Sequence, residues 1–527
     1  MSIPDSKSAP ATVRGAQNKL KPNTIGLIGV VFMVVAFSAP ITAMSGNVPV
    51  AVGYGNGIGA PAGFILATIV LTIFSFGFTA LAKHITSAGA FYTFVSRGLG
   101  KPLGLGTGFL SMLAYMTMEA GLCGIFAVFA QQTFHDQFGI DLPWLVYALI
   151  AVLVMSLLSY RDISLASKVL SVVLIGEVLL LGAVAFSVLF HGGGSDGLMP
   201  ESLNPVNSLS TNGLVAGSVG VGLLFAFWSW VGFESTAIYG EESRDPKRVI
   251  PRATLIAVIG IGVFYAFISW AMVAGNGADQ AVALATSDNP FQMLLTPTEV
   301  FVGSWAVTAM QWFMILGSFA CALAIHNSAT RYLYAIGRDE ILPAVLGRSH
   351  AKHQSPHIAS VFQSCFAAAL LVICFFTGVD PYGELYVLVA MFATISFLVA
   401  QTLTSVAAIW YFHVRKRHPE TASWWRTVLS PIIGGAGMIY VIYLLLSNWE
   451  IAAGPAGETL VGKAVPWIVF IVLAIGVIVS WIWQKSRPDL YSRIGSTIYD
   501  DRTEALTDMT TPVGVAGVEI EANEGKN

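Results

Sequence analysis

Residues 224–252, LFAFWSWVGFESTAIYGEESRDPKRVIPR, begin as an apolar helix and end in a cluster of acids, bases and prolines. Between these two parts the helical pattern breaks, from Trp228 to Gly232, and an acid follows at Glu234. An interrupted helix persists in lipid only where it lines a cavity and where its freed backbone groups find partners. The stretch therefore predicts a discontinuous transmembrane helix.

The composition of the whole chain is that of a membrane protein. Of its 527 residues 55% are hydrophobic and only 11% are charged, and the mean hydropathy of +0.71 is too high for a water-soluble domain. Runs of about 20 apolar residues predict twelve spans, over 24–52, 61–82, 104–134, 143–160, 166–190, 213–240, 252–275, 302–327, 357–377, 383–412, 427–447 and 465–484. An even number of spans places both termini on the same side.

The basic residues indicate which side that is. Every lysine and arginine except Lys463 falls in the two tails or in alternate loops. Because basic residues are enriched in cytoplasmic loops, both termini are expected in the cytoplasm, with the chain crossing the cell (plasma) membrane many times.

A second interruption is expected in the first span. There Ser38-Ala39-Pro40 follows about 14 apolar residues, and proline removes a helical hydrogen bond. Two interrupted spans that lie five helices apart predict a 5+5 inverted repeat. The expected organisation is a tail (1–23), a first repeat (24–200), a second repeat (201–412), helices 11 and 12 (413–485) and a largely disordered tail (486–527).

Several local motifs support a family resemblance. Four motifs carry it: residues 227–234 (FWSWVGFE), 240–252 (GEESRDPKRVIPR), 87–92 (SAGAFY) and 331–339 (RYLYAIGRD). Over about 24–483 the chain resembles the amino acid, polyamine and organocation (APC) superfamily of transporters. This resemblance implies an all-α integral membrane protein with the LeuT-type fold and interrupted helices 1 and 6. In one respect the chain departs from many members, because Ser38-Ala39-Pro40 replaces a glycine-containing break in helix 1.

The resemblance also implies a substrate site near the bilayer midplane, between helices 1, 3, 6, 8 and 10. A substrate ammonium would meet carbonyls at the end of the first half of helix 6, and a carboxylate would meet the amides and hydroxyls of the helix 1 break. Trp228 would stack over the ligand, and Glu119 would lie beside the pocket. Packing roles for Trp228, and a bond between helices for Glu119, are the alternatives. The expected substrate-binding residues are Ser38, Ile41, Thr42, Ala43, Glu119, Phe225, Trp228 and Ser229.

Two further roles are expected from charged residues. Glu177, inside the fifth span, is a carboxylate able to bind and release the coupling proton, or else a neutral acid bonded to a backbone carbonyl. The eighth span offers few hydroxyls for sodium, which favours a proton over sodium. Trp230, Glu242 and Arg244 are expected at a gate, although a solvated loop would explain Glu242 and Arg244 equally well. Glu234 is interpreted as a favourable charge at a helix N-terminus.

These observations predict a secondary transporter that moves an amino acid, with proton symport favoured over exchange. A transporter or exchanger of polyamines or other organic amines is the alternative, and a nutrient sensor of the same fold is a remote one. No motif of a membrane-embedded enzyme is evident, so no catalytic residue, metal, cofactor or nucleic acid is expected. The sequence leaves the substrate's identity and the oligomeric state open.

Overall fold

The structure is a computed structural model that describes residues 20, 23–161, 163–211, 215, 217–350, 353–449, 456–457 and 459–496, with side chains left out over 161–170. Most of the first tail and the residues beyond 496 therefore lie outside it. Apart from two isolated bridges, Ile25–Ser243 and Gly194–Gly197, the described residues form helices, turns and loops.

The longer helices are α2 (Leu27–Ser38), α5 (Ala60–Ala82), α6 (Ala90–Gly98), α7 (Lys101–Phe138), α8 (Trp144–Arg161), α9 (Ile163–Phe190), α10 (Val219–Trp228), α12 (Pro246–Asn276), α13 (Ala278–Ala285), α14 (Gln292–Phe301), α15 (Ser304–Arg338), α16 (His357–Phe376), α17 (Val387–Ile409), α18 (Ser430–Ser447) and α20 (Leu460–Ser486). Short helices are α3 (Pro40–Thr42), α4 (Val48–Val50), α11 (Ser235–Ile238) and α21 (Pro488–Arg493). Helical turns cover Ala43–Asn47, Ala51–Asn56, Gly57–Gly59, Pro200–Leu203, Pro205–Leu209, Tyr239–Glu242, Pro381–Tyr386, Trp410–Val414, Pro419–Thr421 and Trp425–Leu429.

Within the described part, 9 helical stretches are long and apolar enough to cross a membrane, so the chain is a multi-pass membrane protein. The first of them, Leu27–Ala82, covers two expected spans. Two apolar helices, Trp144–Tyr160 and Val219–Trp228, are shorter. Together these helices overlap all the expected spans, but the count of twelve and the inverted repeat stay predictions.

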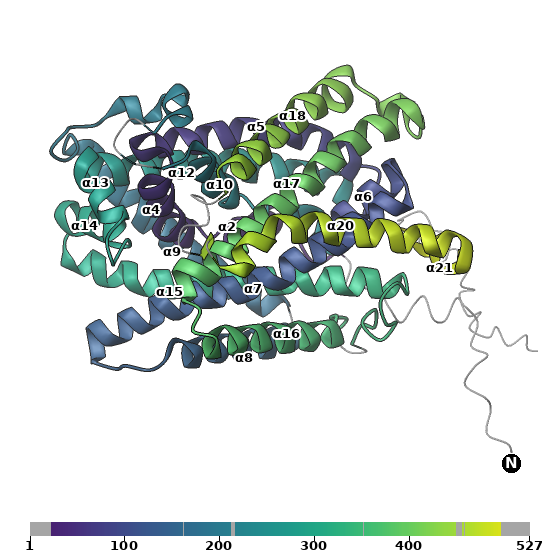
Figure 1. Ribbon diagram of the computed structural model, residues 1–527, viewed down its shortest axis with the longest axis horizontal. Coiled ribbons are helices and arrows are strands. Elements are labelled where there is room, and N and C mark those ends of the chain that lie inside the picture. The colour runs from purple at the N-terminus through teal and green to yellow at the C-terminus, as the bar shows by residue number, and fades with distance from the viewer. Residues whose placement is uncertain are drawn as a thin grey trace, which may run out of the picture.

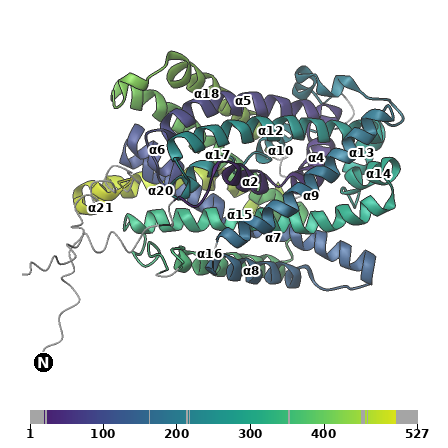
Figure 2. The ribbon, with the colours of Figure 1, turned by 180° about the vertical axis from the view of Figure 1, so that it is seen from behind.

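The long helices run side by side and enclose short, broken segments. Figure 1 shows α5, α7, α12, α15, α16 and α20 extending along the longest axis, with α2, α4 and α10 between them. The view from behind shows the same arrangement, with α6 and α21 at one end of the bundle and α13 and α14 at the other (Figure 2). Irregular backbone thus lies inside the protein, where other helices satisfy its polar groups.

Candidate functional site

The first interruption lies where the sequence predicts it. Helix α2 ends at Ser38, and Ala39 adopts a left-handed conformation with φ 45° before Pro40 starts α3. A left-handed non-glycine residue costs about 1–3 kcal/mol, so surrounding contacts must hold it. The freed carbonyl of Phe37 accepts a hydrogen bond from Cys321 Sγ at 2.9 Å, and that of Ser38 accepts one from Tyr265 Oη at 2.5 Å. Helices α15 and α12 therefore stabilise the break.

The second interruption packs directly against the first. Helix α10 ends at Trp228, and the chain turns until α11 begins at Ser235. Gly232 has φ 114°, and a Cβ atom there would lie 1.8 Å from Phe37 Cδ1. Only glycine combines that backbone conformation with that close approach. Gly232 therefore lets the two broken helices touch.

A small cavity lies between the two breaks. Its volume is about 30 Å³, which is room for about one or two water molecules. Every residue that lines it is buried. The lining residues are Phe37, Ser38, Ala39, Thr42, Ala43, Asn47, Met118, Leu122, Trp228, Ser229, Val231, Cys321, Ile325 and Tyr386. None of these residues carries a formal charge, and the cavity must widen before it can hold an organic molecule.

One wall of the cavity is a chain of hydrogen bonds. It joins the turn after α3, the end of α10 and the turn before α17. The indole Nε1 of Trp228 donates to Tyr386 Oη at 2.9 Å, and this hydroxyl donates to Asn47 Oδ1 at 2.6 Å. Asn47 Nδ2 donates to Ser229 Oγ at 2.8 Å, and Ser229 Oγ donates to the carbonyl of Phe225 at 2.8 Å. The chain fixes the orientation of Trp228 at the end of α10.

Thr42 contributes a polar group without a partner. Its side chain is 1% exposed, and its Oγ1 has no hydrogen-bond partner among the described residues. A buried hydroxyl left unpaired costs about 1–3 kcal/mol. Because Thr42 lines the cavity, a molecule bound there is a natural partner for this hydroxyl.

Of the expected substrate-binding residues, Ser38, Thr42, Ala43, Trp228 and Ser229 line the cavity, while Ile41, Glu119 and Phe225 do not. The carbonyl of Phe225 is taken by the backbone N–H and the hydroxyl of Ser229.

Asn47 and Tyr386 are lining residues that sequence reasoning missed. Asn47 is a polar residue within the first apolar run, and Tyr386 begins the tenth, so polarity inside a span was the available signal.

Glu177 lies behind the helix 1 break. Its side chain is 1% exposed, and its carboxylate accepts a hydrogen bond from the backbone of Ile41. A Cβ atom on Gly317 of α15 would lie 2.4 Å from Glu177 Oε2, and this oxygen has no partner among the described residues. The acid therefore fills the space between α9, α15 and the start of α3.

Glu119 faces away from the cavity, into a separate polar cluster. His326 Nδ1 lies 2.9 Å from Glu119 Oε2, and Gln363 Nε2 donates to the same oxygen at 2.7 Å. The other ring nitrogen of His326 lies 2.8 Å from Ser360 Oγ. The cluster joins α7, α15 and α16, while its neighbours Met118 and Ile325 face the cavity.

Glu234 forms hydrogen bonds within the second interruption and to α7. Its Oε1 accepts from Tyr115 Oη at 2.5 Å, and its Oε2 accepts from the backbone N–H of Gly232 at 3.0 Å. Its side chain makes no hydrogen bond to an N–H of α11. Glu234 therefore ties the helix 6 break to α7.

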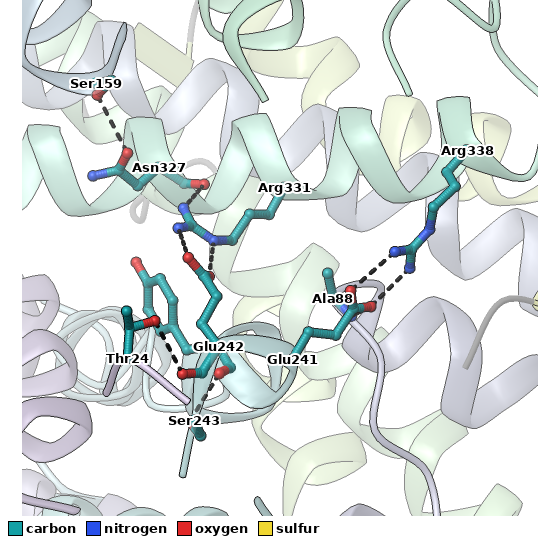
Figure 3. Close-up of polar contacts among 10 residues, drawn as sticks. Thr24, Ala88, Ser159, Glu241, Glu242, Ser243, Asn327, Arg331 and Arg338 are labelled. Carbon is teal, nitrogen blue, oxygen red and sulfur yellow. Dashed lines mark hydrogen bonds and ion pairs between the residues drawn. The ribbon is translucent and has the colours of Figure 1, made fainter. Parts of the chain in front are cut away.

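Two ion pairs lie beyond the helix 6 break, one buried and one partly buried (Figure 3). Glu242 accepts from Arg331 Nε at 2.7 Å and Nη2 at 2.9 Å, and Glu241 accepts from Arg338 Nη1 at 2.9 Å and Nη2 at 2.7 Å. Burial alone would raise the pKa of Glu241, but the Arg338 guanidinium outweighs it, and the pKa ends below its ordinary value. Both pairs connect the loop after helix 6 to α15.

The other two expected gate residues take different positions. Arg244 donates from Nε to the carbonyl of Asn23 at 3.1 Å, and it is Arg331 that pairs with Glu242. Trp230 packs between Phe64 and Tyr265 and donates to the carbonyl of Val258. Its ring is fully buried and is absent from the cavity wall.

Comparison with known proteins adds independent findings. Residues 24–479 match the family described as amino acid permease. The branched-chain amino acid permease BcaP of Bacillus subtilis is 21% identical, over 82% of this chain and 87% of its own length. The low-affinity putrescine importer PlaP of Escherichia coli is 26% identical, over 76% and 83%. The methylthioribose transporter of Bacillus subtilis is 22% identical, over 80% and 85%.

Proposed function

The chain belongs to the amino acid permease family of the APC superfamily, and we propose that it carries an amino acid across the plasma membrane by alternating access. The relatives are transporters and not enzymes. In this proposal helices 1–5 and 6–10 form inverted repeats, both termini are cytoplasmic, and the bundle opens alternately to each side of the cavity.

The uncharged cavity wall carries the substrate assignment. A zwitterion needs a donor for its carboxylate, and Thr42 Oγ1, at the start of the second half of helix 1, has no partner in the described part of the chain. Carbonyls near Trp228, at the end of α10, are the proposed partners of the ammonium. Met118, Leu122 and Ile325 form an apolar part of the wall. This combination favours an α-amino acid with an apolar side chain.

A proton is the proposed coupling ion, with Glu177 as its carrier. An ionised carboxylate inside a membrane is costly unless it is paired or wetted, and Glu177 Oε2 has no partner among the described residues. The acid also contacts Ile41, next to Thr42 in the helix 1 break. Proton uptake and substrate binding would then act on the two sides of one segment.

Uptake by purified protein in proteoliposomes tests the proposal. We expect a pH gradient, acid outside, to drive accumulation of apolar amino acids without sodium. The Glu177→Gln variant should lose this accumulation but retain counterflow of labelled substrate, which would also exclude a non-transporting sensor. Sodium-dependent, pH-indifferent uptake, or unchanged acid-driven uptake by the variant, would overturn the coupling assignment.

An organic amine is the second candidate substrate, and similarity to the putrescine importer favours it. A diamine carries two cationic ends, however, and the lining residues include no acid to meet them. Competition between putrescine and a labelled apolar amino acid distinguishes the two. If putrescine inhibits uptake of the label and unlabelled apolar amino acids do not, an organic amine replaces the first assignment.

A further inference from the structure

A second, larger pocket is lined in part by residues of α6 and α21, two helices that lie at one end of the bundle (Figure 1). Its volume is about 580 Å³, far larger than the cavity between the helix breaks. Its basic lining residues come from distant parts of the chain: His84, Arg97, Lys101, Arg415, Arg417 and His418. The transport cycle proposed above uses none of these residues.

The arginines and the lysine of this basic pocket, Arg97, Lys101, Arg415 and Arg417, form no ion pair within the described part of the chain. Two acids of this region, Asp339 and Glu420, already have partners. Asp339 accepts from Tyr92 Oη at 2.7 Å, and Glu420 Oε1 lies 3.0 Å from His418 Nδ1.

Backbone carbonyls of the C-terminal segment instead meet Arg97 and Lys101, while Arg415 donates to the carbonyl of Arg97 at 3.0 Å. Arg97 donates to the carbonyls of Gly495 at 3.1 Å and Ser496 at 2.9 Å. Lys101 donates to the carbonyl of Ser492 at 2.7 Å, and its Nζ lies 5.0 Å from the centre of the Tyr491 ring. The chain therefore runs along the pocket up to Ser496, which is itself a lining residue.

The sequence that follows Ser496 is acidic. Residues 497–527 contain Asp500, Asp501, Glu504, Asp508, Glu519, Glu521 and Glu524, against Arg502 and Lys526. The first acid comes four residues after Ser496, within a reach of about 14 Å for an extended chain. Carboxylates and guanidinium groups form strong, charge-assisted hydrogen bonds with each other.

We propose that the basic pocket is the docking site of the chain's own C-terminal segment, with Asp500, Asp501 and Glu504 as its ligands. Arg97, Arg415 and Arg417 are the proposed partners of these carboxylates. The segment also contacts the end of α15, because the N–H of Gly495 donates to Asp339 Oδ2 at 3.1 Å. Asp339 directly follows Arg338, which pairs with Glu241. Docking would therefore hold the helix that carries the gate pairs.

Binding of an isolated peptide tests this inference independently of transport. The probe is a fluorescent peptide of residues 497–510, offered to protein in nanodiscs of uncharged lipid. A chain that ends at Ser496 should bind the peptide at least about tenfold more tightly than the full chain, in which the pocket is already filled. The full chain with Asp500→Asn, Asp501→Asn and Glu504→Gln should bind the peptide as tightly as the shortened chain does. This variant replaces the shortened chain in the test if shortening impairs folding.

Two controls separate charge pairing from adhesion. Arg417→Ala in the shortened chain should weaken peptide binding about tenfold, the loss expected for one charge-assisted hydrogen bond. Lys463→Ala, at the start of α20 and outside the pocket lining, should leave peptide binding unchanged. A peptide with the three acids neutralised should not bind.

Equal peptide binding by the shortened and full chains would overturn the proposal, as would tight binding of the neutral peptide. Binding of the shortened chain to phosphatidylglycerol vesicles through Arg417, without peptide binding, would assign the pocket to lipid headgroups instead.

Discussion

His326 Nδ1 lies 2.9 Å from Glu119 Oε2, and both side chains are fully buried. The pair joins α15 to α7 directly behind Ile325 and Met118, which line the cavity. Glu119 thus affects the shape of the cavity indirectly, because its hydrogen bonds fix the position of Met118, which lines the cavity.

Removing one member of this pair should destabilise the protein. Glu119→Ala leaves His326 Nδ1 and Gln363 Nε2 short of a buried partner, at a cost of about 1–3 kcal/mol. We expect Glu119→Ala and His326→Ala each to lower the melting temperature in detergent. The double variant should lose less than the sum of the single variants. Additive losses would show that the two side chains do not interact.

Thr42→Val tests the proposed carboxylate site without disturbing the fold. Valine keeps the shape of threonine and removes a hydroxyl that has no partner in the described residues. The melting temperature should therefore stay the same or rise. The KM for amino acid uptake should rise about two- to tenfold, the loss of one hydrogen bond. As the control, Ser45→Ala removes a hydroxyl already bonded to the carbonyl of Ile41. Unchanged KM in Thr42→Val would place the carboxylate elsewhere.

Arg331 and Arg244 should differ sharply in their effect on access to the cavity. Arg331 forms a buried bidentate pair with Glu242, and breaking such a pair costs about 3–5 kcal/mol, whereas the side chain of Arg244 bonds a backbone carbonyl and no carboxylate among the described residues. Cys321 lines the cavity, so its labelling by a polar maleimide reports access. Arg331→Ala should speed this labelling at least about tenfold, with Arg244→Ala close to the parent protein.

Cys321→Ser identifies the label on the other cysteines. Equal labelling rates in the two arginine variants would argue against the ion pair as a gate.

The sequence alone predicts the broken helices well but their partners poorly. The break at Ala39 follows from Pro40, a local effect of chain chemistry. The pairing of Glu242 with Arg331 depends on where α15 packs, which no local pattern records.

The rotation of α7 is decided in the same way, by packing. Successive helical residues point about 100° apart, so Met118 reaches the cavity while Glu119, one residue later, meets His326. The sequence locates Glu119 in the span and leaves its direction undetermined.

His84 should make the fold sensitive to mild acid. Burial, followed by the charge of His418 stacked 4.0 Å away, lowers the pKa of His84 from 6.5 to about 4. Glu420 opposes this shift, while Lys83 and Lys247 add to it. Between pH 6.5 and 4 the unfolded chain binds a proton here that the folded chain rejects, so stability falls as the pH falls.

In the chain that ends at Ser496, whose pocket holds none of the tail's carboxylates, His84→Asn should therefore reduce the drop in melting temperature between pH 7 and pH 5 by about 1–2 °C, since the ring is only half-buried. The exposed His191, replaced by Asn, is the matched control. An equal acid-induced drop in both variants would contradict the assignment.

The small size of the cavity also affects how fast ions leak through the protein when no substrate is bound. A space for about one or two water molecules, lined by buried side chains, gives ions no hydrated path between its two sides. Uncoupled leakage through this conformation should be slow. A cell could then keep many copies of the protein in its membrane, idle for lack of substrate, without dissipating its ion gradients.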